Sequence, residues 1–268
     1  MNNRVCNRDF VRENEIMQTA EPFLPICFCV DTSCSMLRKI GGTDRATGEH
    51  IGPTRLELLN RCARRFVAEM FNSDDISCAV EIAVVTFDET AKVVLDFSRV
   101  EQCEYDRQSH LVGCSQLKIP ELKAGGTGTA MRAGIECALD LMKKCKEDYR
   151  RYGVEYFQPW LVLITDGATT DSEEEFEEIK QHVSDLVRDE KLWVYPFAVG
   201  TRAGAKALEG ISSEQPVLDL EFSNLPKVFY KMSQGAVKVS NSVYGTKPPV
   251  IEPYSVIGWA EGMDDVDR

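Results

Sequence analysis

Residues 24–31 read LPICFCVD, a short and nearly continuous apolar run that ends in an aspartate. Such a run is typical of a central strand covered on both faces. A similar run at residues 160–165, WLVLIT, leads directly into Asp166 and Gly167. The chain therefore contains two predicted buried strands, each of which is followed at once by an acidic side chain.

The segments around these strands alternate between helical and strand patterns. Thr54 is expected to cap a helix with apolar residues at helical spacing, and Ser172 to open another in a capping box with Glu175. Residues 78–87 and 91–97 are rich in strand-forming residues, and Asp88-Glu89-Thr90 between them favours a tight hairpin. The other expected elements are helices from about 131 to 145, over 203–210 and over 224–240, strands over 191–199 and 216–220, and an irregular region up to about residue 124.

This order predicts an α/β fold. Strands that alternate with helices form a doubly wound, mostly parallel sheet, and the single hairpin adds one antiparallel strand, expected at an edge. The sequence suggests an N-terminal extension at 1–22, one domain at 23–242 and a C-terminal tail at 243–268. The tail from Gly245 onward contains three prolines and an acidic end, and it is expected to lie outside the core.

Composition excludes several classes of protein. The 268 residues carry a net charge of −12, which disfavours binding to nucleic acid because no concentrated basic patch is present. No apolar stretch is long enough for a signal peptide or a membrane span, so a cytoplasmic protein is expected. The ten cysteines include no Cys-x-x-Cys pair, and most are expected to be buried thiols. Cys103 and Cys114 are the pair where an exception would be sought.

Three polar motifs fall at strand ends or helix starts. They are Asp31-Thr32-Ser33-Cys34-Ser35, Gly125-Gly126-Thr127 and Thr165-Asp166-Gly167. In an open α/β sheet, ligands bind beyond the carboxyl ends of the strands. The best-placed groups are two carboxylates and three hydroxyls, which suit Mg²⁺, Mn²⁺ or Ca²⁺ better than zinc or copper.

Each motif alone also has a purely structural explanation. Asp-x-Ser-x-Ser is compatible with a turn and a helix N-cap, Gly-Gly-Thr with a flexible entry to a capping Thr, and Thr-Asp-Gly with a turn that ends a strand. The three motifs together, in this order, favour a metal site.

The combined pattern resembles the metal-ion-dependent adhesion site of von Willebrand factor A domains, over about residues 23–242. The resemblance implies a Rossmann-like fold in which Ser33 and Ser35 bind a metal, most simply Mg²⁺. It also implies that Asp31 and Asp166 bind directly or through water and that Thr127 joins in one conformational state. An acidic residue of a partner protein would supply the last ligand. Cys34 departs from the family, which usually has Gly there, and it would be strained if that position needs a positive φ.

Within the family, the compact element order and the closing stretch at 229–242 resemble small bacterial stand-alone members from tellurite-resistance and stress gene clusters. That resemblance implies a scaffold whose partner is a protein with an acidic surface, such as a kinase or phosphatase of the same cluster. The insertion at 36–53 is compatible with a solvated loop. It is also compatible with a partner-selecting border of the metal site, in which Arg38 and Lys39 face the acidic partner.

The alternative function is a Mg²⁺-dependent hydrolase or phosphotransferase. The sequence offers no evident general base, because His50, His110 and His182 lie in unrelated contexts. The Gly-rich segment at 125–129 lacks the lysine of a nucleotide-binding loop, and no Gly-x-Ser-x-Gly elbow is present. The sequence therefore favours a binding module over an enzyme.

Overall fold

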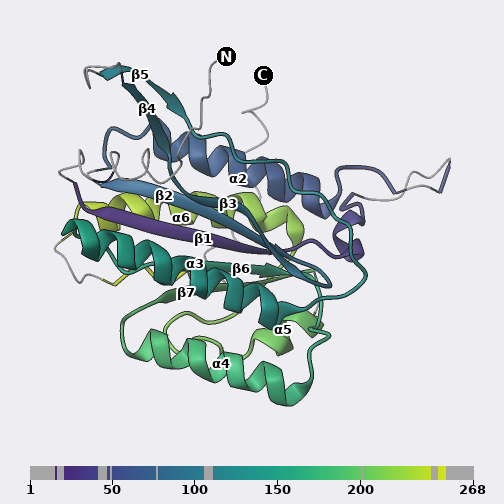
Figure 1. Ribbon diagram of the computed structural model, residues 1–268. Coiled ribbons are helices and arrows are strands. Elements are labelled where there is room, and N and C mark those ends of the chain that lie inside the picture. The colour runs from purple at the N-terminus through teal and green to yellow at the C-terminus, as the bar shows by residue number, and fades with distance from the viewer. Residues whose placement is uncertain are drawn as a thin grey trace, which may run out of the picture.

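A six-stranded sheet forms the centre of the molecule, with strand order β3-β2-β1-β6-β7-β8 (Figure 1). The computed structural model describes residues 16, 21–41, 47–48, 50–76, 78–105, 111–200, 202–242 and 247–251. The strands of this sheet are β1 (Phe23–Asp31), β2 (Ala79–Phe87), β3 (Ala91–Arg99), β6 (Trp160–Thr165), β7 (Trp193–Val199) and β8 (Leu218–Leu220).

All neighbours in the sheet are parallel except one pair. Strand β1 lies between β2 and β6 and pairs in parallel with both, and every one of its residues is buried. The edge strand β3 runs antiparallel to β2, and the Asp88 N–H donates to the Thr90 carbonyl in the turn between them (3.1 Å). The predicted α/β sheet with one antiparallel edge strand is confirmed.

The helices begin where the capping residues predict. Thr54 forms a capping box with Glu57 at the start of α2 (Arg55–Phe71), and Ser172 forms one with Glu175 at the start of α4 (Glu173–Arg188). Such boxes satisfy amide groups that a helix leaves unpaired at its N-terminus. The remaining helices are α3 (Met131–Tyr152), α5 (Arg202–Leu208) and α6 (Leu225–Ser240), with short 3-10 turns η1 (Cys34–Leu37) and η2 (Phe222–Asn224).

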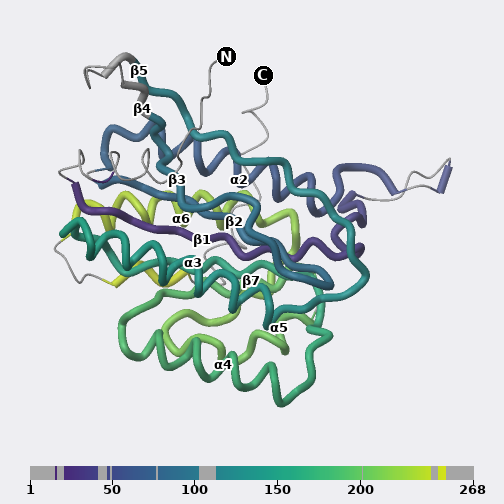
Figure 2. Tube along the Cα trace, viewed as in Figure 1, coloured from purple at the N-terminus to yellow at the C-terminus, as the bar shows by residue number. Residues whose placement is uncertain are grey.

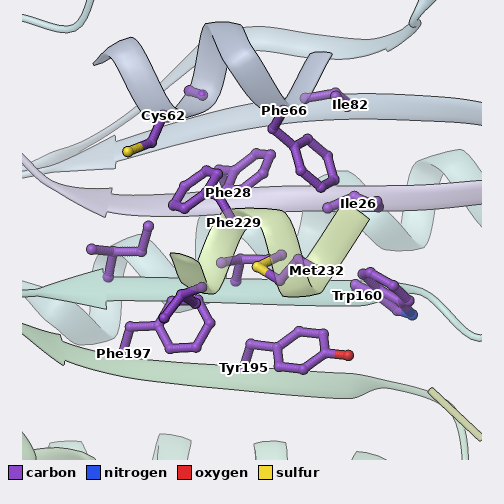
Figure 3. Close-up of a cluster of buried hydrophobic side chains, with 14 of the residues drawn as sticks. Ile26, Phe28, Cys62, Phe66, Ile82, Trp160, Tyr195, Phe197, Phe229 and Met232 are labelled. Atoms are coloured by element: carbon purple, nitrogen blue, oxygen red, sulfur yellow. The ribbon is translucent and has the colours of Figure 1, made fainter. Parts of the chain in front are cut away.

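Two apolar layers hold the helices to the two faces of the sheet. On one face, α2 and α6 bring Phe66 and Phe229 onto Phe28 of β1, with ring centroids 5.6–6.1 Å apart (Figure 3). On the other face, α3, α4 and α5 cover the alternate side chains of the same strands, including Cys27 and Cys29. Because the sheet is covered on both sides at its centre, β1, β6 and β7 are nearly continuous apolar runs rather than alternating ones.

A two-stranded ribbon stands apart from this sheet (Figure 2). It consists of β4 (Glu101–Tyr105) and β5 (Leu111–Gln116), which pair antiparallel and place Cys103 directly opposite Cys114. The prediction of an irregular region here was wrong. The ribbon pairs with itself and covers little of the core, so its sequence lacks the apolar alternation that marks a half-buried strand.

Part of the C-terminal segment packs on the domain. Ile251 is buried, its N–H donates to Gln215 Oε1 (2.8 Å), and its carbonyl accepts from Gln215 Nε2 (3.0 Å). Pro249 accepts a hydrogen bond from the Tyr195 hydroxyl. The expectation that everything after Gly245 lies outside the core is therefore wrong for Pro248 and Ile251, which are buried, whereas Lys247 and Val250 are exposed. At the other terminus, Ile16 is buried in the layer under α3 and α4.

Cys27, Cys29, Cys62, Cys78 and Cys145 are buried thiols, as expected for most of the cysteines. Burial raises the pKa of the Cys62 and Cys78 thiols to about 12, which keeps them protonated and unreactive at neutral pH. Within the same ranges, no helix is both long and apolar enough to cross a membrane.

Candidate metal centre

The carboxyl ends of the parallel strands meet at one edge of the sheet, which lies at the right of Figure 1. Asp31 is the last residue of β1, and Asp166 directly follows β6, its neighbour. Both carboxylates are almost fully buried. Adjacent parallel strands thus bring together two acids that are 135 residues apart in the numbering of the chain.

A chain of hydrogen bonds joins these acids through two serines. The Ser33 N–H donates to Asp31 Oδ1 (2.8 Å), and the Ser33 and Ser35 hydroxyl oxygens lie 2.8 Å apart. The Ser35 hydroxyl donates to Asp166 Oδ1 (2.5 Å). The structure therefore brings four of the five predicted site residues into one connected group of oxygen atoms.

Burial affects the protonation of Asp31. Burial raises the pKa of the Asp31 carboxyl, and the hydrogen bonds from Ser33 and from the Thr165 hydroxyl (2.8 Å to Oδ2) oppose that shift only in part. Within the part of the chain that the structure describes, no cation pairs with Asp31. An ionised carboxylate in such a place is stabilised by any cation that reaches it.

Asp166 has a cationic partner that the sequence did not reveal. Arg55, the first residue of α2, donates from Nη1 to Asp166 Oδ2, and its side chain is only 14% exposed. The sequence marked the helix start through Thr54 but gave no sign of where the Arg55 side chain points. Thr165 was likewise quoted only as part of a motif, although it is a direct donor to Asp31.

The Gly-Gly-Thr segment lies against the serine loop. Ser33 and Gly126 form a parallel bridge, in which the Cys34 N–H donates to the Gly126 carbonyl (2.8 Å). A Cβ on Gly126 would lie 2.5 Å from the Asp88 Cβ, so the close approach requires glycine. The glycine therefore places Thr127 at the border of the site.

Thr127 itself is engaged elsewhere. Its N–H (3.2 Å) and its hydroxyl (2.6 Å) both donate to Glu89 Oε1, and these bonds lower the pKa of the Glu89 carboxyl. Thr127 also does not cap α3, whose N-cap is Ala130. The structure thus places Thr127 beside the four connected residues, with its hydroxyl on Glu89 rather than on them.

The insertion after the serine loop is anchored at both ends. The Ile40 N–H donates to the Pro53 carbonyl and the Arg55 N–H to the Arg38 carbonyl, so residues 38–40 and 53–55 run side by side next to the site. Residues 42–46 and 49 lie outside the described ranges. Cys34 is exposed, and Glu190 is the one described non-glycine residue with a positive φ. The strain considered for Cys34 is therefore absent.

The donor set is rich in oxygen. Two buried carboxylates and two hydroxyls point to a hard divalent cation, and Thr127 could add a third hydroxyl. The described ranges contain no group of three or more His, Cys, Asp or Glu side chains placed to hold a metal ion. Any ion at this site would therefore depend on the serine hydroxyls as ligands. His50 is exposed before α2 and His182 lies in the middle of α4, while His110 lies outside the described residues.

Comparisons with known proteins agree with this fold. Residues 26–169 match the von Willebrand factor type A domain. No curated protein matches the chain. Similar solved structures include a von Willebrand factor type A protein from Catenulispora acidiphila, with 18% identity, a TM-score of 0.50 and coverage of 82% of this chain and 43% of that one.

Two further structures show the same range of similarity. The PilB minor pilin from Streptococcus sanguinis has 13% identity and a TM-score of 0.53, covering 87% of this chain and 64% of that one. Proximal thread matrix protein 1 from the mussel byssus, described with a zinc-occupied MIDAS motif, has 22% identity and a TM-score of 0.49, covering 81% and 46%. The chain spans about half the length of the Catenulispora and mussel proteins, and the likeness to the Catenulispora protein and to PilB shows the fold alone.

Proposed function

Because the chain belongs to the von Willebrand factor type A domain family, we propose that it is a metal-dependent protein-binding module. The observation that carries the proposal is the connected group formed by Asp31, Ser33, Ser35 and Asp166 at the carboxyl edge of the sheet. These residues would hold one divalent cation, most simply Mg²⁺, with Thr127 as a further ligand. The bound ion would supply positive charge that attracts a carboxylate of a partner protein.

The geometry of the chain supports a preformed site. Both serines stand on a loop fixed by backbone bonds to two other segments: the Thr32 N–H donates to the Phe87 carbonyl (2.8 Å), and the Gly125 N–H to the Thr32 carbonyl (3.2 Å). The loop therefore holds its hydroxyls in place before any ligand arrives. Ligands that are fixed in advance lose little conformational entropy when an ion binds.

Binding is favoured over hydrolysis or phosphotransfer by what surrounds the oxygens. Among the described residues, the charged groups joined to the site by hydrogen bonds are Asp31, Asp166 and Arg55. None of the described histidines belongs to this group. A hydrolytic site needs a base within hydrogen-bond reach of the attacking water, and both carboxylates here are already used by donors. Turnover of a generic phosphate ester with Mg²⁺ or Mn²⁺ would contradict this part of the proposal.

The partner class follows from the site and from the narrower family resemblance. The hydroxyls of Ser33 and Ser35 are neutral, so they leave more positive charge on the ion than further carboxylates would, and an acidic protein surface is the expected partner. The resemblance to bacterial stand-alone members makes a kinase or phosphatase from the same stress gene cluster the first candidate. A role as a scaffold in such a complex, in the cytoplasm, is part of this proposal.

The direct test is metal-dependent stabilisation. At a free metal concentration about 100 times Kd, binding to the folded state adds about 2.7 kcal/mol. For a domain of this size that corresponds to a rise in Tm of roughly 5–10 °C. Ser33→Ala and Ser35→Ala should remove most of this rise. Ser98→Ala is the matched control, since that hydroxyl donates to the Asp96 carbonyl on the edge strand (2.8 Å).

A capture experiment from native lysate tests the second half of the proposal. The same proteins recovered with Mg²⁺ should be lost with EDTA and with Ser35→Ala, while Ser98→Ala retains them. An ion-to-carboxylate bond at the centre of an interface acts as a hot spot, so one missing ligand should cost a large share of the affinity. Capture at full strength in EDTA would show that the interface lies elsewhere.

A further inference from the structure

Arg55 occupies a position assembled from several segments of the chain. Its N–H is held by the Arg38 carbonyl (3.0 Å), and its guanidinium lies 4.9 Å from the centre of the Phe222 ring. A Cβ added to Gly200, which has a φ of +83°, would come within 3.3 Å of Arg55 Nη2 and of the same ring. A guanidinium that packs on an aromatic face and pairs with a carboxylate is held in one orientation.

Arg55 changes the net charge that the site would have with a metal bound. Asp31 and Asp166 together carry two negative charges, which a divalent cation would cancel. Arg55 contributes one more positive charge, and its side chain is only 14% exposed, so water screens this charge incompletely. With Arg55 present, the loaded group of residues is positive. Glu89, the acid bound to Thr127, is exposed to solvent, which screens its charge, so it opposes this positive charge only weakly.

We propose that Arg55 is the specificity-determining residue of this site, which strengthens the binding of a carboxylate ligand and weakens the binding of the metal. The inference rests on the proposed function above. Arg55 weakens metal binding because it already satisfies Asp166 Oδ2 and repels a second cation. It strengthens carboxylate binding because it leaves a net positive charge facing the ligand position.

The two effects have opposite signs, and this separates the proposal from a purely structural role. If Arg55 only supported the fold of the site, its loss would loosen Asp166 and weaken both metal and carboxylate binding. If the guanidinium acts through its charge, its loss should tighten metal binding and weaken carboxylate binding. Coupling between neighbouring sites usually changes affinity about 5- to 150-fold, and we expect about tenfold in each direction.

The experiment uses Mn²⁺ and acetate as probes of the full chain. Mn²⁺ affinity is measured by electron paramagnetic resonance of the free ion in a buffer without carboxylates. Acetate affinity is then measured on the Mn²⁺-loaded protein, from the broadening of the ¹³C carboxylate resonance. Arg55→Met removes the charge and keeps an apolar stem over Phe222, and Arg55→Lys keeps the charge. Arg65→Met is the matched control, because Arg65 lies on the same helix in an exposed pair with Glu69.

We expect Arg55→Met to bind Mn²⁺ about tenfold more tightly and acetate about tenfold more weakly. Arg55→Lys should stay within about threefold and Arg65→Met within about twofold of the original chain in both assays. Should the methionine variant fold poorly, Arg55→Gln carries the same expectation, since it is also uncharged. A loss of both affinities together, or a change in neither, overturns the role of Arg55. Unchanged Mn²⁺ binding in Asp31→Asn would instead overturn the proposed metal site itself.

Discussion

In the metal-free protein, replacing each acid of the candidate site by asparagine should change the thermal stability differently. Asp166→Asn should lower the Tm, whereas Asp31→Asn should not. Asp166 pairs with Arg55, whose side chain is only 14% exposed, and removing one partner of a buried ion pair costs about 3–5 kcal/mol. Asparagine keeps one acceptor oxygen for the guanidinium, so we expect Asp166→Asn to cost about 2 kcal/mol. This loss corresponds to a fall in Tm of roughly 4–8 °C.

Asp31→Asn should leave the metal-free Tm unchanged or raise it at neutral pH. Burial raises the pKa of Asp31 above its value in the unfolded chain, so the folded state binds a proton more tightly than the unfolded state does. The cost of burying the ionised carboxylate is therefore fully present above the folded-state pKa. This cost decreases as the pH falls from the folded-state pKa of Asp31 toward its pKa in the unfolded chain. The advantage of Asp31→Asn should shrink over the same range.

Thermal melting in EDTA at pH 7 and at pH 5 checks both expectations, and the same melts with saturating Mg²⁺ serve as the control. Both variants should lose the stabilisation by metal. Without metal, Asp166→Asn should lower the Tm and Asp31→Asn should not. The reasoning would be refuted if both variants lowered the metal-free Tm by similar amounts. That result would mean that Asp31 is stabilised in its ionised form by its hydrogen bonds from Ser33 and Thr165.

Three further outcomes are expected. Tyr149→Phe removes the hydroxyl that donates to the buried Glu81 side chain. It should lower the free energy of unfolding, measured in urea, by about 2 kcal/mol, and adding Glu81→Gln should recover part of this loss. A chain that ends at Gly245 loses the buried Ile251 side chain and its two hydrogen bonds to Gln215. It should be less stable to urea by about 3 kcal/mol, and an unfolding curve like that of the full chain would contradict this packing. Thiol counting in denaturant without reductant should find nearly all ten cysteines, and two or more stable disulfides would count against a reducing compartment.

Most of the fold could be predicted because its signals are local. The strands at 23–31 and 160–165 are apolar throughout, which follows from cover on both faces, and their ends coincide with the first polar residue. Thr54 and Ser172 mark helix starts through bonds that span three residues. Because both signals lie within one element, a single sequence reveals them.

The features that the sequence missed depend on contacts between distant segments. Ile251 is held on the domain by hydrogen bonds with Gln215, 36 residues earlier in the chain. The proline-rich sequence around Ile251 contains no signal that predicts this contact. The ribbon of β4 and β5 pairs only with itself. Arg55 and Asp166 are 111 residues apart, so the sequence showed a site residue and a helix start without showing that they meet.

The four connected residues and Thr127 differ in what holds them, and this difference predicts how the site would change on binding. Asp31, Ser33 and Asp166 are buried, and the loop that carries the serines is bonded to the end of β2 and to Gly126. These groups have little freedom to move. Thr127 is exposed and its hydroxyl is held by one exposed carboxylate, Glu89, through bonds that water can replace. A ligand that draws Thr127 toward the site therefore has to break only this surface contact, while the rest of the site stays as the fold has built it.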